Sequence, residues 1–339
     1  MTHELKEIVR QVILNQKNAY KSVLATVVEL DGSSYRGPGV RMLLTETGEM
    51  TGAVSGGCVE KEIQRQAETV FTTGKAHIMT YDGRYRLGCE GMLYILIEPI
   101  KITDAFLEDF SSCLLQRNGF SIQTYYNKKE GAQGHFGSVV KFGKDQIHRL
   151  SDTFDEASSK DLKVFEQLMD PCFRLWLIGG EHDAVKLSYL ALGLGWEVAV
   201  STVPSEDKQI LDFPGVDTFW NVIPENLPVD DIDEQTAVVL MTHSYVKDLK
   251  YLKVLRKTKP MYFGLLGPSK RREKLFGEYM ELYPDDDFEI FEQIYGPAGL
   301  NIGAEAPEEI AIAILAEILT VIRNQEPMLL RNKKQGIHN

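Results

Sequence analysis

The sequence contains few cysteines and no long apolar run. Only four of its 339 residues are cysteine, and no two of them have the CxxC spacing of a structural zinc site. We therefore expect no disulfide framework, and reduced thiols of this kind are typical of the cytoplasm. No window approaches the roughly 18 consecutive apolar residues that a membrane span requires, and residues 1–10 lack the apolar core of a signal peptide. These absences predict a cytoplasmic protein without a membrane span.

Basic residues are also too few for broad contact with a phosphate backbone. The chain has 37 lysines and arginines against 49 aspartates and glutamates, which gives a formal net charge of −12. Nucleic-acid binders usually carry a large basic face that releases counterions. We therefore expect no nucleic-acid partner, although a local basic pocket is compatible with this balance.

The chain is longer than one hydrophobic core usually serves, so two domains are expected. Residues 1–150 mix short apolar strands with a few helical segments, which predicts an α+β domain. Residues 151–171 are polar, acidic and helical in pattern and predict a linker helix. Residues 172–325 alternate short apolar runs with helical stretches, as in a parallel sheet of the Rossmann type. Residues 326–339 are expected to form a tail.

The run Leu175–Ile178 ends in Gly179-Gly180-Glu181-His182-Asp183, which has the layout of a dinucleotide-binding turn. In such turns a second glycine lets the pyrophosphate approach the backbone, but Glu181 stands there. The next strand should end in an acid for the ribose hydroxyls, and it ends in Thr202. We therefore favour a Rossmann scaffold in which Asp183 caps the helix over one that binds NAD(P) conventionally.

Polar residues follow several of the expected parallel strands. Because ligands of open α/β sheets bind beyond the carboxyl ends of the strands, His182, His243 and Gly267 should gather in one cleft. Residues 264–269 join a strand to a helix that begins with Lys270, Arg271 and Arg272. This junction could hold an anion, or it is a solvated basic first turn opposed by the helix dipole. Both interpretations are open.

Two cysteines of the first domain lie beside glycines. Cys58 follows Ser55-Gly56-Gly57 where a helix should begin, a position that lowers the pKa of a thiol. Cys89 lies in a glycine-flanked irregular stretch. Cys113 and Cys172 have apolar neighbours and are expected to be buried. A third irregular stretch, residues 33–39, has hydroxyls and an arginine suited to an oxyanion, or is only a strand connection stiffened by proline.

These motifs occur together and in order in the XdhC/CoxI family, accessory factors of xanthine dehydrogenase and related molybdenum hydroxylases, which the sequence closely resembles. The motifs are Ala25–Glu29 with Gly32–Arg36, Gly39, Ser55–Glu60, Gly88–Gly91 with Leu96–Pro99, Gly179–Asp183, Leu194–Trp196, Met241–Ser244 with Asp248, Gly264–Gly267 with Arg271 or Arg272, and Gly299–Gly303 with Pro307–Ile310. Several separate motifs in the expected order are far more specific than one glycine pattern. This sequence departs from the family at Glu181, which replaces a glycine, and at Thr202, where many relatives have aspartate.

The resemblance implies a chaperone of purine catabolism that is an accessory factor rather than a catalyst. Its transient cargo would be molybdenum cofactor, held while a cysteine desulfurase supplies the terminal sulfur. The cofactor, with or without an attached nucleotide, would then be inserted into the molybdenum subunit of xanthine dehydrogenase or a related hydroxylase. Thiols near a soft, sulfur-ligated metal suit this task.

No residue is expected to be catalytic. The candidate cofactor-binding residues are Ser33, Ser34, Arg36, Ser55, Gly56, Gly57, Cys58, Cys89, Gly179, Gly180, His182, Asp183, His243, Gly267 and Arg271. Cys58 and Cys89 would contact the molybdenum. Two alternatives remain: an NAD(P)-dependent oxidoreductase that uses His182 and His243, and a docking protein with a vestigial nucleotide site. A homodimer is compatible with each of them.

Overall fold

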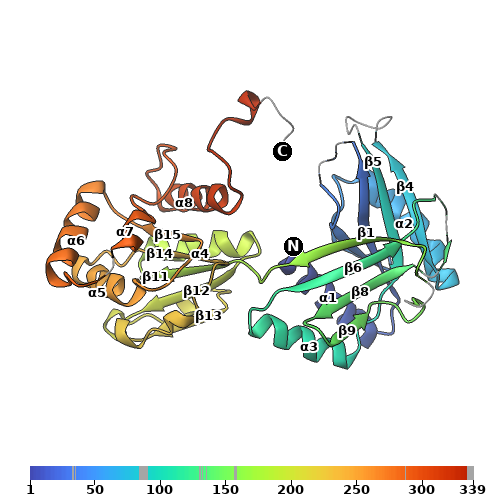
Figure 1. Cartoon of the computed structure of the whole chain (residues 1–339), viewed down its shortest axis with the longest axis horizontal. Coiled ribbons are helices and arrows are strands. Elements are labelled where there is room, and N and C mark those ends of the chain that lie inside the picture. The colour runs from blue at the N-terminus through green and yellow to red at the C-terminus, as the bar shows by residue number, and fades with distance from the viewer. Residues whose placement is uncertain are drawn as a thin grey trace. The chain divides into compact units, whose positions relative to one another are not determined.

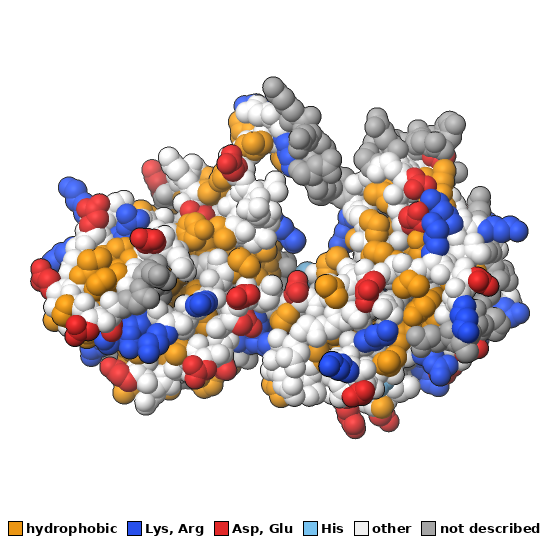
Figure 2. All heavy atoms as spheres, in the orientation of Figure 1, with side chains coloured by type: hydrophobic (Ala, Val, Ile, Leu, Met, Phe, Trp, Pro, Cys, Tyr) orange, Lys and Arg blue, Asp and Glu red, His pale blue; other side chains and the backbone are white. Residues whose placement is uncertain are grey.

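The computed structural model describes residues 1–32, 34, 36–83, 91–129, 131, 133–134, 136–155, 159–286 and 288–333 (Figure 1). The chain divides into two compact units, Met1–Cys172 and Phe173–Asn339. No helix in the described ranges is both long and apolar enough to cross a bilayer. Figure 2 shows acidic and basic side chains interspersed over the visible face of each unit, so the negative net charge is not gathered into one patch there.

The first unit is built on a six-stranded antiparallel sheet with the strand order β3-β2-β1-β5-β4-β7. The strands are β1 (Ser22–Asp31), β2 (Arg41–Thr45), β3 (Met50–Gly52), β4 (Ala76–Asp82), β5 (Met92–Pro99) and β7 (Gln133–Gly134). Helix α2 (Cys58–Thr73) covers one face, where Ile63 and Val70 pack on Ala25 of β1. Leu24 points into a core on the opposite face. Because β1 is buried on both faces, its sequence is apolar from Val23 to Val28 except at Thr26.

A second, four-stranded antiparallel sheet with the order β10-β6-β8-β9 contributes to that opposite core. Its strands are β6 (Phe120–Tyr126), β8 (Gly137–Phe142), β9 (Gln146–Arg149) and β10 (Lys163–Met169). Helices α1 (Thr2–Lys17) and α3 (Asp104–Leu115) supply side chains to the same core, among them Val12 and Phe106. Residues 120–169 therefore complete the first unit.

The prediction of a linker helix at residues 151–171 is wrong. Residues 163–169 form β10, which pairs antiparallel with β6 from Lys163↔Tyr126 to Met169↔Phe120. β10 lies at the end of its sheet and alternates between buried and exposed positions, so Leu168 is 78% exposed while Met169 is 2% exposed. An edge strand with a polar outer face can resemble a solvated helix in sequence.

The second unit is a six-stranded parallel sheet with the order β13-β12-β11-β14-β15-β16, which is the Rossmann order. The strands are β11 (Arg174–Ile178), β12 (Glu197–Thr202), β13 (Thr218–Asn221), β14 (Thr236–Leu240), β15 (Tyr262–Leu265) and β16 (Ile294–Tyr295). The predicted α/β class with a mainly parallel sheet, preceded by an α+β domain, is confirmed. The short strands β13 and β16 were not predicted, because neither is long enough to show a pattern.

Helices cover both faces of this sheet (Figure 1). On one face α4 (His182–Gly193) and α8 (Pro307–Ile322) pack on Leu175 and Leu177 through an apolar cluster. On the other face α5 (Tyr245–Leu255) and α6 (Ser269–Leu282) pack on Trp176 and Ile178. The short helix α7 (Glu289–Glu292) precedes β16. A sheet covered on both faces leaves its strand ends as the places where a ligand can bind.

Candidate functional site

The glycine loop between β3 and α2 places Cys58 at the first residue of α2, with Gly57 as the N-cap. Gly57 has φ +121°, a conformation that side-chain-bearing residues rarely adopt, so the turn depends on glycine there. The Cys58 thiol is exposed and free. The predicted position of this thiol, where a glycine turn meets a helix, is therefore what the structure has.

Glu60 holds this loop in place. Its Oε1 accepts from the backbone N–H groups of Val54 at 3.0 Å and Ser55 at 2.5 Å. Its Oε2 accepts from the Ser55 hydroxyl at 2.7 Å and from the Gly57 N–H at 2.8 Å. Burial alone would raise the pKa of Glu60, but the hydrogen bonds from Ser55 and Gly57 bring it below its usual value. One buried carboxylate thus organises the loop that carries the thiol.

The role of Glu60 was missed in the sequence, although its spacing could have revealed it. In a capping box, the Glu three positions after the N-cap accepts from the backbone N–H of the N-cap residue, and this half of the box does not need an N-cap side chain. Here Gly57 is the N-cap, and the Glu60 side chain returns to its backbone. The motif Ser55–Glu60 is therefore one structural unit.

Arg36 is already satisfied within the first unit. Its guanidinium donates to Glu4 at 2.5 Å and to the carbonyl oxygen of Ala53 at 2.5 Å. Ser34 is half-buried in the same stretch, while Ser33 lies outside the described residues. The oxyanion role expected for Arg36 therefore competes with an internal ion pair.

The other cysteines are of two kinds. Cys113 and Cys172 are buried, as predicted for thiols among apolar neighbours. Cys89 lies outside the described residues, as do its neighbours 84–90. Among the side chains that the structure describes, no group of three or more histidines, cysteines or acids could hold a metal ion. Within that part of the chain, Cys58 therefore does not belong to a preformed metal site.

A buried polar group lies between the two sheets of the first unit and was not expected from the sequence. Arg41 of β2 is 5% exposed and donates from Nη1 to the Gly39 carbonyl oxygen at 3.0 Å and to Gln167 Oε1 at 2.5 Å. Its Nε and Nη2, and the hydroxyl of Thr26 opposite it in the register, have no partner in the described part of the chain. Burial lowers the pKa of Arg41 to about 10.

Glu98 of β5 is fully buried on the same layer. It accepts from the Ser138 N–H at 2.8 Å and from the Ser138 hydroxyl at 2.5 Å. Burial raises the pKa of Glu98 to about 7 despite these hydrogen bonds. Arg41 and Glu98 make this layer polar at its centre, which the near-continuous apolar pattern of β1 did not indicate.

In the second unit the glycine turn after β11 is shaped by packing. Gly179 has φ +131°, and a Cβ there would meet the Met241 carbonyl oxygen, so β11 and β14 end against each other. Helix α4 begins at His182, and its N-cap is Glu181, which makes no side-chain cap bond. The prediction that Asp183 caps this helix is wrong, because the helix starts one residue earlier and Asp183 lies in its first turn.

Asp183 instead lies close to His243. Its Oδ2 is 3.4 Å from His243 Nε2, and His243 is a half-exposed residue after β14 with φ +55°. Side-chain-bearing residues at positive φ are uncommon and often occur at functional sites. The structure therefore brings together two of the residues that the sequence placed in the cleft. His182 is exposed at the start of α4.

The basic first turn of α6 is neutralised internally. Arg271 Nη2 lies 2.5 Å from Asp248 Oδ2, a nearly buried carboxylate that also accepts from the Thr242 hydroxyl at 2.5 Å. A Cβ on Gly267 would meet the Arg271 stem, so glycine lets that side chain reach Asp248. Arg272 donates to the Gly296 carbonyl oxygen at 2.7 Å. Neither of the two expectations, a free anion site or a solvated turn, describes these arginines.

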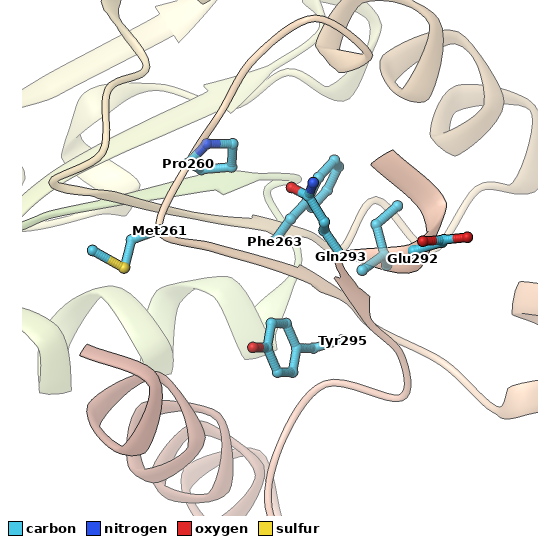
Figure 3. Close-up of a pocket in the computed structure, with 7 residues that line it drawn as sticks. Pro260, Met261, Phe263, Glu292, Gln293 and Tyr295 are labelled. Carbon is cyan, nitrogen blue, oxygen red and sulfur yellow. The ribbon is translucent and has the colours of Figure 1, made fainter. Parts of the chain in front are cut away.

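A pocket in this unit lies at the opposite edge of the sheet from these residues. A cavity of about 430 Å³ is lined by residues around the amino ends of β15 and β16, among them Met261, Phe263 and Tyr295 (Figure 3). Ligands of open α/β sheets normally bind at the carboxyl ends. We therefore take the turns after β11, β12, β14 and β15, and not this pocket, as the candidate ligand site of the second unit.

Comparisons with known proteins agree with this architecture. The model of the XdhC Rossmann domain matches residues 175–318, and that of the XdhC and CoxI family matches residues 16–82. A crystal structure described as a xanthine dehydrogenase from Bacillus halodurans superposes with a TM-score of 0.75 at 23% identity, and covers 95% of this chain and 98% of its own. That likeness shows the fold.

Two curated relatives match nearly end to end. A protein of Bacillus subtilis (strain 168), named as a probable xanthine dehydrogenase subunit, is 29% identical over 318 residues, which cover 88% of this chain and 92% of that protein. The molybdenum cofactor insertion chaperone PaoD of Escherichia coli (strain K12) is 25% identical over 331 residues, covering 96% and 91%. With a family domain matched in each of its two units, the chain belongs to the XdhC and CoxI family.

Proposed function

We propose that this protein is a chaperone that binds molybdenum cofactor and inserts it into xanthine dehydrogenase or a related molybdenum hydroxylase. The observation that carries the proposal is the match to PaoD, a molybdenum cofactor insertion chaperone, along 96% of the chain. A relative named as a xanthine dehydrogenase subunit supports the choice of partner. Such a protein binds and delivers its cargo and need not catalyse a reaction.

The first unit offers a thiol suited to this cargo. Molybdenum in the cofactor is sulfur-ligated, and a thiolate is a soft ligand that suits such a metal. Cys58 is exposed at the start of a 16-residue helix, whose N-terminal dipole favours negative charge. We infer that Cys58, with Cys89, contacts the molybdenum while a cysteine desulfurase supplies the terminal sulfur. Because Arg36 and Arg271 are paired with Glu4 and Asp248, they are weaker candidates for the phosphate of the cofactor.

Cofactor retention tests this proposal. The full-length protein would be mixed with molybdenum cofactor under anaerobic conditions and passed through a gel-filtration column. We expect pterin and molybdenum to co-elute with the protein, and transfer to apo-hydroxylase to restore its activity. If neither pterin nor metal co-elutes, the proposal fails.

A cysteine series tests the role of the thiols. We expect Cys58→Ser and Cys89→Ser to lower the retained molybdenum at least several-fold. Cys113→Ala, which removes a buried thiol, is the matched control and should retain the metal once its folding has been verified by circular dichroism. Equal retention by all three variants would remove the cysteines from the mechanism and leave cofactor binding itself untouched.

A further inference from the structure

Arg41 presents two unused donor atoms to the layer between the two sheets of the first unit. Its Nη1 reaches across this layer to Gln167 Oε1 of β10 at 2.5 Å, and it also donates to the Gly39 carbonyl oxygen. Nε and Nη2 form the other edge of the guanidinium, a fork of N–H groups that can bind one acceptor together. The described chain offers no partner to either atom, although the side chain is only 5% exposed. A buried fork without an acceptor is costly, which indicates a ligand at this edge.

Thr26 adds an unused hydroxyl at the neighbouring position. Thr26 of β1 lies directly opposite Arg41 in the antiparallel pairing of β1 with β2. Directly opposed residues have Cβ atoms about 4.5–5.5 Å apart and point to the same face of a sheet, so both side chains enter the layer between the sheets. Thr26 is fully buried, and its Oγ1 has no hydrogen-bond partner within the described ranges. Two adjacent side chains therefore leave three polar atoms unsatisfied in one place.

The positive charge of Arg41 also lacks a close counter-charge. Burial lowers the pKa of Arg41 to about 10, so the guanidinium is still protonated at neutral pH. Two carboxylates of the described chain act on it electrostatically, Glu98 and Glu4, and neither forms an ion pair with it. Glu4 is bound to Arg36, and burial raises the pKa of Glu98 to about 7, so Glu98 is mostly protonated in slightly acidic solution.

The charge decides between the two kinds of ligand that could fill this place. A buried water molecule would satisfy the free hydrogen-bonding groups and leave the cation uncompensated. An anion accepts the same hydrogen bonds and also supplies the missing charge. The cost of removing an ion from water rises with the square of its charge, which disfavours sulfate and phosphate in a buried layer. A single negative charge of small size therefore fits best.

We propose that the first unit binds a monovalent anion of halide size between its two sheets, held by the Nε–Nη2 edge of Arg41 and the hydroxyl of Thr26. Every one of these groups is a donor, so the site selects a negatively charged acceptor. The bound anion joins β1 to β2 within the core, and its effect is on the stability of the first unit. This proposal does not depend on molybdenum cofactor binding.

Thermal unfolding of the full-length protein in two sodium salts tests the proposal. Chloride fits the site, whereas gluconate is too large for a closed layer, and the two salts would be compared at equal ionic strength and slightly acidic pH. A ligand that binds only the folded state stabilises it by mass action, so we expect the unfolding temperature to rise with the logarithm of the chloride concentration. Equal unfolding temperatures in the two salts would overturn the proposal and leave water as the occupant.

Variants then locate the anion. Thr26→Val keeps the shape of the side chain and removes the hydroxyl, so we expect about tenfold more chloride to be needed for the same rise. Thr26→Ser keeps the hydroxyl and should respond as the wild type does. Thr202→Val removes a similarly buried and unpartnered hydroxyl from the second unit and is the matched control, which should leave the chloride response unchanged. An undiminished response in folded Thr26→Val would contradict the assignment.

Crystals grown in bromide give the position directly, because bromide scatters anomalously and can take the place of chloride. We expect an anomalous peak within hydrogen-bond distance of Arg41 Nη2 and Thr26 Oγ1 in the wild type, and a weaker peak or none in Thr26→Val. A wild-type map without a peak beside Arg41 would overturn the proposal. Because molybdenum cofactor is absent from these experiments, the chaperone proposal would stand.

Discussion

Two buried ionisable residues affect the stability of the first unit, although the overall composition gives no sign of them. Arg41 and Glu98 are almost completely enclosed between the two sheets of the first unit, and neither forms an ion pair within 4.0 Å with a described residue. A buried charge without a close counter-charge is costly. The pKa of about 7 at Glu98 and of about 10 at Arg41 both reflect that cost.

The raised pKa of Glu98 predicts a pH dependence of stability. The folded protein holds a proton on Glu98 where the unfolded chain, with a pKa near 4.5, has lost it. Stability should therefore fall as the pH rises from about 4.5 to about 7, by up to roughly 3 kcal/mol at 1.36 kcal/mol per unit.

Urea denaturation of Glu98→Gln across this range measures the effect. The amide mimics the protonated acid, so the variant should lack this part of the decline. Glu68→Gln, an exposed position on α2, should decline as the wild type does. Parallel curves for Glu98→Gln and wild type would show that Glu98 titrates normally.

At the scale of elements, features set by neighbouring residues in the sequence could be predicted, and contacts between distant residues could not. The end of strand β12 was predicted at Thr202, where the structure has it, because a short apolar run precedes it and the strand is buried from Val198 onward. β10 was mistaken for a helix because its outer face is solvated. The contact of Arg271 with Asp248 joins residues on two helices, and that of Lys208 with Gly180 joins a loop to a turn. Such contacts depend on the path of the sheet, which no spacing in the sequence records.

The start of α2 also illustrates this difference. The sequence indicated a glycine turn followed by a helix with Cys58 at its start, because all of these residues are neighbours in the chain. It did not indicate that Glu60 would bind four donors of the loop at once. The thiol could be located from the pattern, and the spacing of Glu60 from Gly57 allowed a capping role, but the bonds of Glu60 to Val54 and Ser55 required coordinates.

Substitution of Glu60 tests how much this loop depends on one carboxylate. In Glu60→Gln an NH₂ group faces donors, so we expect the free energy of unfolding to fall by about 2 kcal/mol. Because the folded pKa of Glu60 is lowered, its contribution is present above the usual pKa and is lost as the pH falls through the lowered value.

Chemical denaturation at neutral and acidic pH measures this loss. Glu68→Gln on the exposed face of the same helix is the control and should change stability by less than about 0.5 kcal/mol. The difference between the two variants should shrink at acidic pH, where the wild-type carboxylate is also protonated. A difference that stays constant with pH would mean that the hydrogen bonds do not depend on the charge.

At the scale of the whole molecule, each unit has its own hydrophobic core. The clusters around Trp176 and Leu175 contain only residues of the second unit, and the clusters around Leu24 and Ala25 contain only residues of the first. The chain separates between Cys172 and Phe173. Domains with separate cores can generally fold alone.

Separate expression of the two units tests this independence. We expect residues 1–172 and 173–339 each to unfold cooperatively on heating, with near-ultraviolet circular dichroism spectra that sum to that of the intact protein. The aromatic pairs of each unit, such as Phe106 with Phe142 and Phe276 with Phe291, lie within one fragment and should give these spectra. A fragment that lacks a cooperative transition would show that its core needs the other unit.

The contact between Arg41, Gln167 and Gly39 also constrains how this family can change over time. A side chain at position 39 would run into Gln167, and Gln167 is one of the two acceptors that Arg41 has among the described residues. A change at one of the three positions therefore leaves a clash or an unsatisfied cation in the core. Relatives should replace these residues together or keep them together, so an alignment in which they vary independently would count against this account of the first unit.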